Sequence, residues 1–121
     1  HELTSGILNM GFSKDDILVS SFSPIELYDL HELGSIFPLA VLVDRDPNGA
    51  EEFAMEIDAA ALHPNFEFTN PEYIKICHGL DLLVNVWTVN ENADMMKMLE
   101  MGVDGLITDK VAEASKLLSS M

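Results

Sequence analysis

Short apolar runs alternate with helix-like segments along this chain, and this alternation limits the possible folds more than any other feature. The runs are continuously apolar rather than alternating in polarity, which is typical of parallel strands covered on both faces. We expect strands at 17–22, 39–43, 59–63, 82–89 and 105–108, and helices near 1–10, 24–33, 50–57, 70–78, 91–101 and 110–119. The pattern predicts an α/β fold built from parallel βα units with right-handed crossovers.

Capping residues and glycines mark the ends of the expected helices. Ser23 and Asn70 each precede a proline, so both are expected N-caps with proline at the first helical position. Asn90 can cap the helix that runs to Met101. A glycine follows several of the helices, where it is expected to take the left-handed conformation that ends a helix. These glycines are at 11, 34, 79 and 102, and their spacing indicates an internal repeat of βα units.

Length, charge and cysteine content limit the class of protein. At 121 residues the chain is a single domain, residues 1–121, with enough sequence for a hydrophobic core. A formal net charge of −15 argues against binding to nucleic acid or to an anionic membrane, since both would repel it. No apolar run approaches the roughly 18 residues of a membrane span, and the start of the chain does not resemble a signal peptide. The lone cysteine, Cys77, is expected in the core of a protein of the reducing cytoplasm.

Polar and aromatic residues stand at the carboxyl ends of the expected strands. Parallel strands share a direction, so these residues should lie at one edge of the sheet, where α/β proteins build their sites. In chain order they are Ser21 and Phe22, then Asp44, Arg45 and Asp46, then His63, then Trp87, Thr88 and Asn90, and finally Thr108 and Asp109. This edge of the sheet is therefore the expected site.

Position alone leaves the roles of three of these residues open. Arg45, the only arginine, fits a loop salt bridge with its neighbouring aspartates or a contact to an anion. Trp87, the only tryptophan, fits a core residue or a surface that contacts a ligand. His63 fits a polar ligand contact or a structural histidine bonded to nearby backbone. No nucleophile motif surrounds Ser21, no glycine-rich phosphate loop is present, and no complete catalytic constellation assembles.

Four segments together resemble a known family. They are 17–22 (Ile-Leu-Val-Ser-Ser-Phe), 63–64 (His-Pro), 84–90 (Val-Asn-Val-Trp-Thr-Val-Asn) and 102–109 (Gly-Val-Asp-Gly-Leu-Ile-Thr-Asp). Their order and spacing resemble the carboxyl-terminal half of the glycerophosphodiester phosphodiesterase family, over nearly the whole chain. The last two segments are the specific ones, and the Ser-Ser-Phe element alone is a weak signal.

The resemblance implies a TIM-type (β/α) barrel, of which this chain is the carboxyl-terminal half. The family hydrolyses glycerophosphodiesters to glycerol 3-phosphate and an alcohol with a divalent metal, Mg²⁺ or Ca²⁺, as part of lipid and glycerol metabolism. Its catalytic His-Arg, Glu-x-Asp, later His and Glu-x-Lys motifs belong to the amino-terminal half, which precedes the part matched here. Residues 56–58 match Glu-x-Asp only in their letters, because they lie where a helix leads into the beginning of a strand.

By the same resemblance, this half supplies pocket wall and neither catalytic groups nor metal ligands. Phe22 and Trp87 are expected as apolar surfaces against the glycerol or alcohol portion of a glycerophosphodiester. Ser21 and His63 are expected as further substrate-binding residues.

A half-barrel has two unpaired strand edges and an exposed apolar interior, which monomers avoid. We therefore expect self-association into a homo-oligomer or completion by another chain. The alternative function is a non-catalytic half-barrel that acts as a binding or assembly module. A small receiver-like α/β domain fits less well, because the end of the first strand lacks the acidic cluster that such a domain needs.

Overall fold

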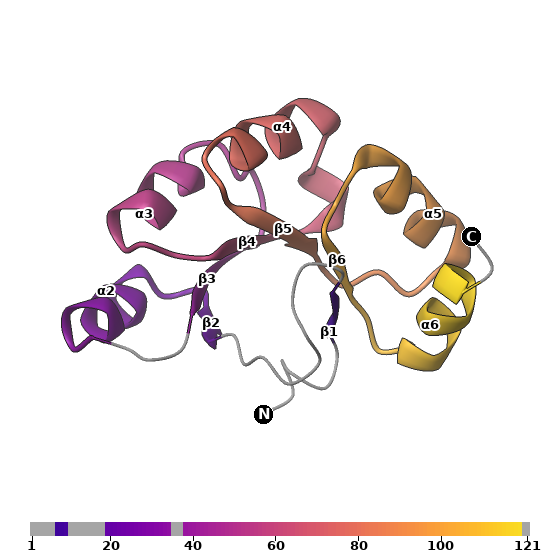
Figure 1. The fold of residues 1–121 in the computed structure, drawn as a ribbon, viewed down its shortest axis with the longest axis horizontal. Helices are drawn as coiled ribbons and strands as arrows, with labels where there is room; N and C mark the ends of the chain where they lie inside the picture. The colour runs from indigo at the N-terminus through magenta and orange to yellow at the C-terminus, as the bar shows by residue number, and fades with distance from the viewer. Residues whose placement is uncertain (1–6, 10–18, 35–37, 120–121) are drawn as a thin grey trace.

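The fold is an arc of strands with helices along its outer side. The computed structural model describes residues 7–9, 19–34 and 38–119. Within these ranges every α-helix lies on the convex side of the arc (Figure 1). From residue 19 onward each strand is followed by a helix, as expected for parallel βα units.

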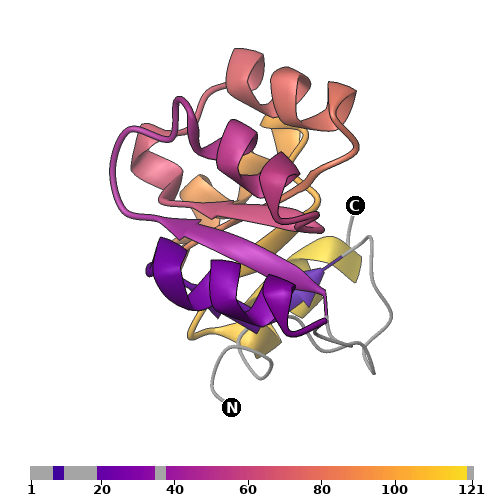
Figure 2. The same ribbon diagram turned by 90° about the vertical axis from the view of Figure 1, so that its left-hand side faces the viewer.

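The described residues form a six-stranded sheet in the order β1-β6-β5-β4-β3-β2. The strands are β1 (Ile7–Asn9), β2 (Val19–Ser21), β3 (Leu39–Val43), β4 (Ala61–Pro64), β5 (Leu83–Val86) and β6 (Gly105–Ile107). The helices are α2 (Pro24–Glu32), α3 (Ala50–Glu56), the 3₁₀ helix η1 (Phe66–Phe68), α4 (Pro71–Gly79), α5 (Asn92–Met101) and α6 (Val111–Ser119). Strands β2 to β6 pair in parallel, and α2 covers one end of the arc, nearest the viewer in Figure 2. Among the residues that the structure describes, no helix is both long and apolar enough to span a membrane.

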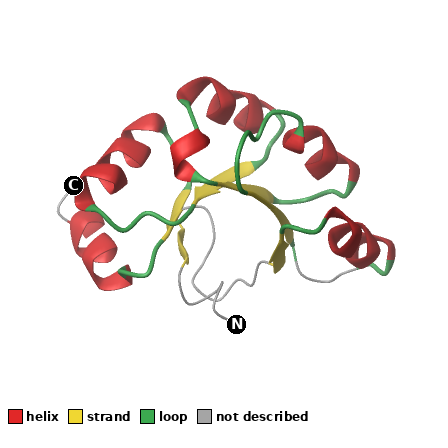
Figure 3. Ribbon diagram, turned by 180° about the vertical axis from the view of Figure 1, so that it is seen from behind, coloured by secondary structure: helices red, strands yellow, loops and turns green. Residues whose placement is uncertain are grey.

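The strand register separates a helix-covered face from a concave face. Val41, Leu62 and Val84 stand side by side on three neighbouring strands and belong to the main hydrophobic core. This core fills the space between the strands and the outer helices, which Figure 3 shows from behind. Alternate strand residues point to opposite faces. His63 and Asn85, one position further along β4 and β5, therefore lie on the concave face.

Cys77 is a core residue, as the sequence predicts, and two methionines of α5 are buried with it. Cys77, Met95 and Met98 are buried in the main core. Burial raises the pKa of the Cys77 thiol to about 11. The thiol is therefore protonated at neutral pH and serves as a small apolar side chain.

The helix expected near 1–10 is wrong, because Ile7–Asn9 form strand β1. This strand pairs antiparallel with β6, with Ile7 opposite Ile107 and Asn9 opposite Gly105. The edge of β6 offers N–H and C=O groups that need partners, and pairing them outweighs the helix propensity of so short a segment. One of the two strand edges expected to be free is therefore paired. The rest of the segment 1–10 lies outside the described residues.

Two of the three expected N-caps are confirmed. The side chains of Ser23 and Asn70 each accept a backbone N–H from the first turn of α2 and α4, at 3.2 and 2.8 Å. Asn90 is not a cap, since Glu91 occupies the N-cap of α5 and makes no side-chain capping bond. The Asn90 side chain bonds instead to the residues that follow β6.

The expected glycine at the end of α5 is confirmed, and the one at the end of α4 is not. Gly102 follows α5 with a φ of 98°, the left-handed conformation that favours glycine. Gly79 is instead the last residue of α4, and Asp81 takes the left-handed conformation with a φ of 60°. Aspartate tolerates this conformation better than most side chains do, so the chain turns there without glycine. Gly11 lies outside the described residues.

Candidate functional site

Two of the predicted site residues, Phe22 and Trp87, meet at the carboxyl ends of the parallel strands. Phe22 follows β2 and Trp87 follows β5, yet their ring centroids lie 5.6 Å apart. The rings cross at 77°, an edge-to-face contact of the kind that aromatic pairs prefer. Phe22 is 56% exposed and Trp87 is partly buried. We call this pair the aromatic wall.

The main chain at the end of β4 and just after it holds Trp87 in place. The indole Nε1 donates to the carbonyl oxygen of His63 at 2.6 Å. The backbone N–H of Trp87 donates to the carbonyl of Pro64 at 3.2 Å, and the carbonyl of Trp87 accepts from the backbone N–H of Phe66 at 2.9 Å. An indole has a single N–H and no acceptor. The polar atom of the Trp87 side chain is therefore already used within the protein.

The His63 side chain lies on the concave face beside Asn85. Asn85 Nδ2 donates to His63 Nε2 at 3.0 Å, and both side chains are fully buried. Burial lowers the pKa of His63 to about 3, because the charged imidazolium would lose its hydration. The ring is therefore neutral near pH 7, and because Nε2 accepts from the amide, its hydrogen is on Nδ1.

The sequence did not place Asn85 at the site, and it placed Asn90 there with the wrong role, as a helix cap. Asn85 is an asparagine inside an apolar strand, two residues before Trp87. Since residues two apart on a strand point to the same face, this position could have placed Asn85 on the concave face. Asn90 Oδ1 accepts from the Thr108 hydroxyl at 2.9 Å and from the Asp109 backbone N–H at 3.0 Å. Asn90 Nδ2 donates to Asp109 Oδ2 at 3.2 Å. We call Asn90, Thr108 and Asp109 the Asn90 cluster, and it joins the chain after β5 to the chain after β6.

Ser21 and Arg45 are the other two predicted residues to be placed. Ser21 is the last residue of β2 and its backbone stands opposite Val41, but its side chain lies outside the described part of the structure. Arg45 is exposed, and no ion pair joins it to another described residue. The loop salt bridge that the sequence left open for Arg45 is therefore not seen in the described part of the chain.

Comparison with known proteins identifies the family. The model of the glycerophosphoryl diester phosphodiesterase family matches residues 2–113. The chain belongs to this family. The resemblance carried by the Trp-Thr-Val-Asn and Gly-Val-Asp-Gly segments is therefore confirmed.

The curated relatives of this chain are more than twice as long as the segment that they share with it. A glycerophosphodiester phosphodiesterase of Caldanaerobacter subterraneus is 28% identical over 96 residues, which are 79% of this chain and 40% of the relative. One of Bacillus altitudinis is 31% identical over 110 residues, which are 89% of this chain and 45% of the relative. The chain therefore spans about two fifths of the length of the curated relatives it matches.

Solved structures confirm the fold class. A phosphodiesterase of Oleispira antarctica, solved in complex with the product sn-glycerol-3-phosphate, superposes with a TM-score of 0.80 at 20% identity. The match covers 89% of this chain and 44% of that one. The parallel βα units are thus the half of a TIM-type barrel that the sequence predicts.

The described residues of this chain do not form a binding site for a divalent metal. They contain no group of three or more histidine, cysteine, aspartate or glutamate side chains placed to hold an ion. Glu56 and Asp58 are exposed, on either side of the buried Ile57, at the end of α3 that leads into β4. They therefore stand at the opposite end of the strands from the aromatic wall.

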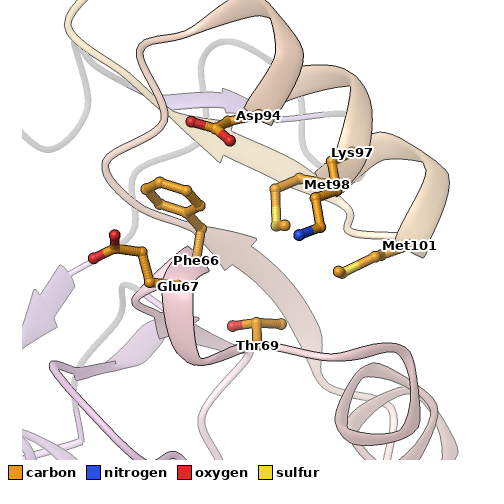
Figure 4. Close-up of a pocket in the computed structure, with 7 residues that line it drawn as sticks. All are labelled: Phe66, Glu67, Thr69, Asp94, Lys97, Met98 and Met101. Carbon is orange, nitrogen blue, oxygen red and sulfur yellow. The ribbon is translucent and has the colours of Figure 1, made fainter.

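A pocket of about 330 Å³ lies on the helical side of the barrel half, between η1 and α5. Figure 4 shows the side chains that line it, Phe66, Glu67, Thr69, Asp94, Lys97, Met98 and Met101. Neither Phe22 nor Trp87 borders this pocket. It is a groove in the outer layer, separate from the aromatic wall.

Proposed function

We propose that this chain is part of a metal-dependent glycerophosphodiester phosphodiesterase and supplies one wall of the substrate pocket. The observation that carries the proposal is the contact between Phe22 and Trp87, residues distant in sequence that meet at the carboxyl ends of the strands. In TIM barrels, active sites lie at that end. Family membership supports hydrolysis of glycerophosphodiesters to glycerol 3-phosphate and an alcohol.

The aromatic wall suits the carbon-rich portion of such a substrate. Phe22 presents an exposed ring, and the indole N–H of Trp87 is occupied by the His63 carbonyl. The wall can therefore exclude water and contact the glycerol or alcohol carbons, whereas the phosphate oxygens need donors or cations from elsewhere. Ser21 and His63 stay predicted as further substrate-binding residues. The full burial of the His63 side chain favours the structural role that the sequence also left open.

The acid, the base and the metal ligands are proposed to come from βα units outside this chain. When bound in the complete enzyme, Mg²⁺ or Ca²⁺ would neutralise phosphate charge. The described residues of this chain do not form a ligand cluster for it, and the one histidine at the aromatic wall is buried with its pKa lowered to about 3. The contribution of this chain is therefore to bind, to orient and to exclude water.

The surface proposed to receive those further units lies around β2 and α2. On α2, Ile25 is 75% exposed and Tyr28 is 48% exposed, one helical turn apart. In the described sheet β2 pairs with β3 and has no strand on its outer side. A further strand on β2, with a helix against Ile25 and Tyr28, would continue the barrel. The net charge of −15 disfavours a second copy at this surface and favours a different chain or segment, although a homo-oligomer stays the other possibility.

A reconstitution assay tests the proposal. The chain is mixed with the amino-terminal half of the Bacillus altitudinis relative and supplied with glycerophosphocholine and Mg²⁺ or Ca²⁺. We expect turnover by the mixture and a higher KM when Trp87→Ala replaces the natural chain, because the wall binds carbon rather than reacting atoms. The exposed Asn92→Ala is the matched control, and it should leave KM unchanged.

The same assay separates the alternative, a non-catalytic half-barrel that acts as a binding or assembly module. That function predicts a stable complex by size-exclusion chromatography without turnover.

The compartment is proposed as the cytoplasm, because the lone Cys77 is buried and protonated and takes no part in a disulfide.

A further inference from the structure

Trp87 is held by three bonds to one short segment, and all three involve the main chain of that segment. The side chain donates to the carbonyl of His63, and the backbone bonds to Pro64 and Phe66. A parallel bridge between Asn65 and Trp87 accompanies these bonds. The position of the indole therefore depends on where the backbone of 63–66 lies relative to β5.

The His63 and Asn85 side chains add a bond across the same two strands. They join β4 to β5 on the concave face, through the bond from Asn85 Nδ2 to His63 Nε2 at 3.0 Å. Asn85 lies two residues before Trp87 on the same strand, and His63 carries the carbonyl that accepts the indole N–H. Both side chains are fully buried, so loss of either partner removes a bond between the two strands in a place that water does not reach.

We propose that Asn85 and the His63 side chain are positioning residues, which hold the Trp87 indole in one orientation with its N–H occupied, so that the aromatic wall offers only carbon to a ligand. In this proposal both side chains act through the strands, so His63 takes the structural role rather than the substrate contact that the sequence also predicts. The inference deepens the proposed function, because it states which substrate atoms the wall can accept. The orientation of Trp87 can also be tested without an assay of enzymatic activity.

Trp87 reports on its own orientation, since it is the only tryptophan in the chain. In the natural chain, time-resolved fluorescence anisotropy should show an indole that rotates with the protein and not independently of it. Fast independent rotation of Trp87 in the natural chain would overturn the proposal before any variant is made. Circular dichroism on the same samples verifies that the chain is folded.

Asn85→Ala is the first variant. We expect a red-shifted Trp87 emission and about a twofold higher acrylamide quenching constant, because an indole released from its anchor samples solvent. Asn70→Ala is the matched control, since it removes a bond of 2.8 Å at the start of α4 and lowers stability without touching Trp87. An equal spectral change in both variants would show that the signal follows general destabilisation, and the proposal would fail.

A second pair of variants covers the case in which Asn85→Ala does not fold. His63→Gln retains an acceptor for the Asn85 amide, whereas His63→Leu removes it. We expect natural-like quenching of Trp87 in His63→Gln and increased quenching in His63→Leu. Equal quenching in these two variants would contradict a positioning role. These fluorescence results are independent of turnover, so failure of the proposed phosphodiesterase function and failure of this inference are distinguishable.

Discussion

The carboxyl ends of β4, β5 and β6 differ sharply from the end of the arc formed by β2 and α2. In the first region side chains join each strand to its neighbour, through His63 and Asn85 between β4 and β5 and through the Asn90 cluster between β5 and β6. In the second region Phe22 and Ile25 are 56% and 75% exposed. Both regions are made of the same βα unit.

The difference shows what a unit of this kind gains from its neighbours. A central unit buries its strand residues against helices and satisfies its polar groups across two strand pairs. The unit at β2 has a neighbouring strand on one side only in the described sheet, so its helix leaves an apolar surface exposed. The central region should therefore govern stability, and the β2 and α2 region should govern association.

The largest effect is expected at the Asn90 cluster. Asn90→Ala removes the acceptor of the buried Thr108 hydroxyl and of the Asp109 N–H. We expect the free energy of unfolding to fall by about 2–3 kcal/mol, because the buried Thr108 hydroxyl loses its acceptor and the bond from the Asp109 N–H is lost as well. Urea denaturation followed by circular dichroism measures the loss. The exposed Asn92→Ala provides the control, and a change below about 0.5 kcal/mol in Asn90→Ala would contradict the role given to the cluster.

The next effect is a pH dependence caused by His63. The pKa of His63 is about 3 in the folded chain, whereas the ordinary value of 6.5 applies when the chain is unfolded. Between these values the unfolded chain binds a proton at His63 and the folded chain does not. The contribution of the neutral His63 to the free energy of unfolding is therefore complete above pH 6.5 and is lost as the pH falls toward 3. Between pH 7 and pH 5 we expect a loss on the order of 2 kcal/mol from this group.

His63→Gln should remove this part of the pH dependence, whereas His31→Gln, a change on α2, should keep it. Denaturation curves at both pH values give the comparison directly. An unchanged pH slope in His63→Gln would show that the buried imidazole does not resist protonation.

The smallest effect on stability is expected at α2. Ile25→Gln together with Tyr28→Gln alters exposed side chains, so the free energy of unfolding should change by no more than about 0.5 kcal/mol. Association with the amino-terminal half of the Bacillus altitudinis relative, measured by analytical ultracentrifugation, should weaken because the exposed apolar surface is reduced. Unchanged association in this double variant would remove α2 from the docking surface.

The repeating units were predictable from the sequence because their signals are local. Continuous apolar runs located β3 and β5, and Ser23 and Asn70 marked helix starts that the structure confirms. Strand β1 was not predictable, because it depends on pairing with β6, about a hundred residues away in the chain. Local propensity carries no information about such a partner.

The site was predictable in outline and not in its contacts. The order of strand ends placed Phe22 and Trp87 at one edge, where the structure brings their rings together, and the family resemblance predicts that they form a pocket wall. The roles of Asn85 and Asn90 could not be read in this way, since asparagine fits caps, turns and cross-strand bonds equally well. Their partners are 22 and 18 residues away in sequence, and only the parallel register brings them together.

The most direct test of the central claim is the turnover of glycerophosphocholine by this chain alone, with Mg²⁺ or Ca²⁺. We propose that the chain forms a wall of the pocket and that the catalytic groups lie outside it, so we expect no hydrolysis above the background of the buffer. Rates typical of enzymes, on the order of 1 s⁻¹ or more, would contradict it.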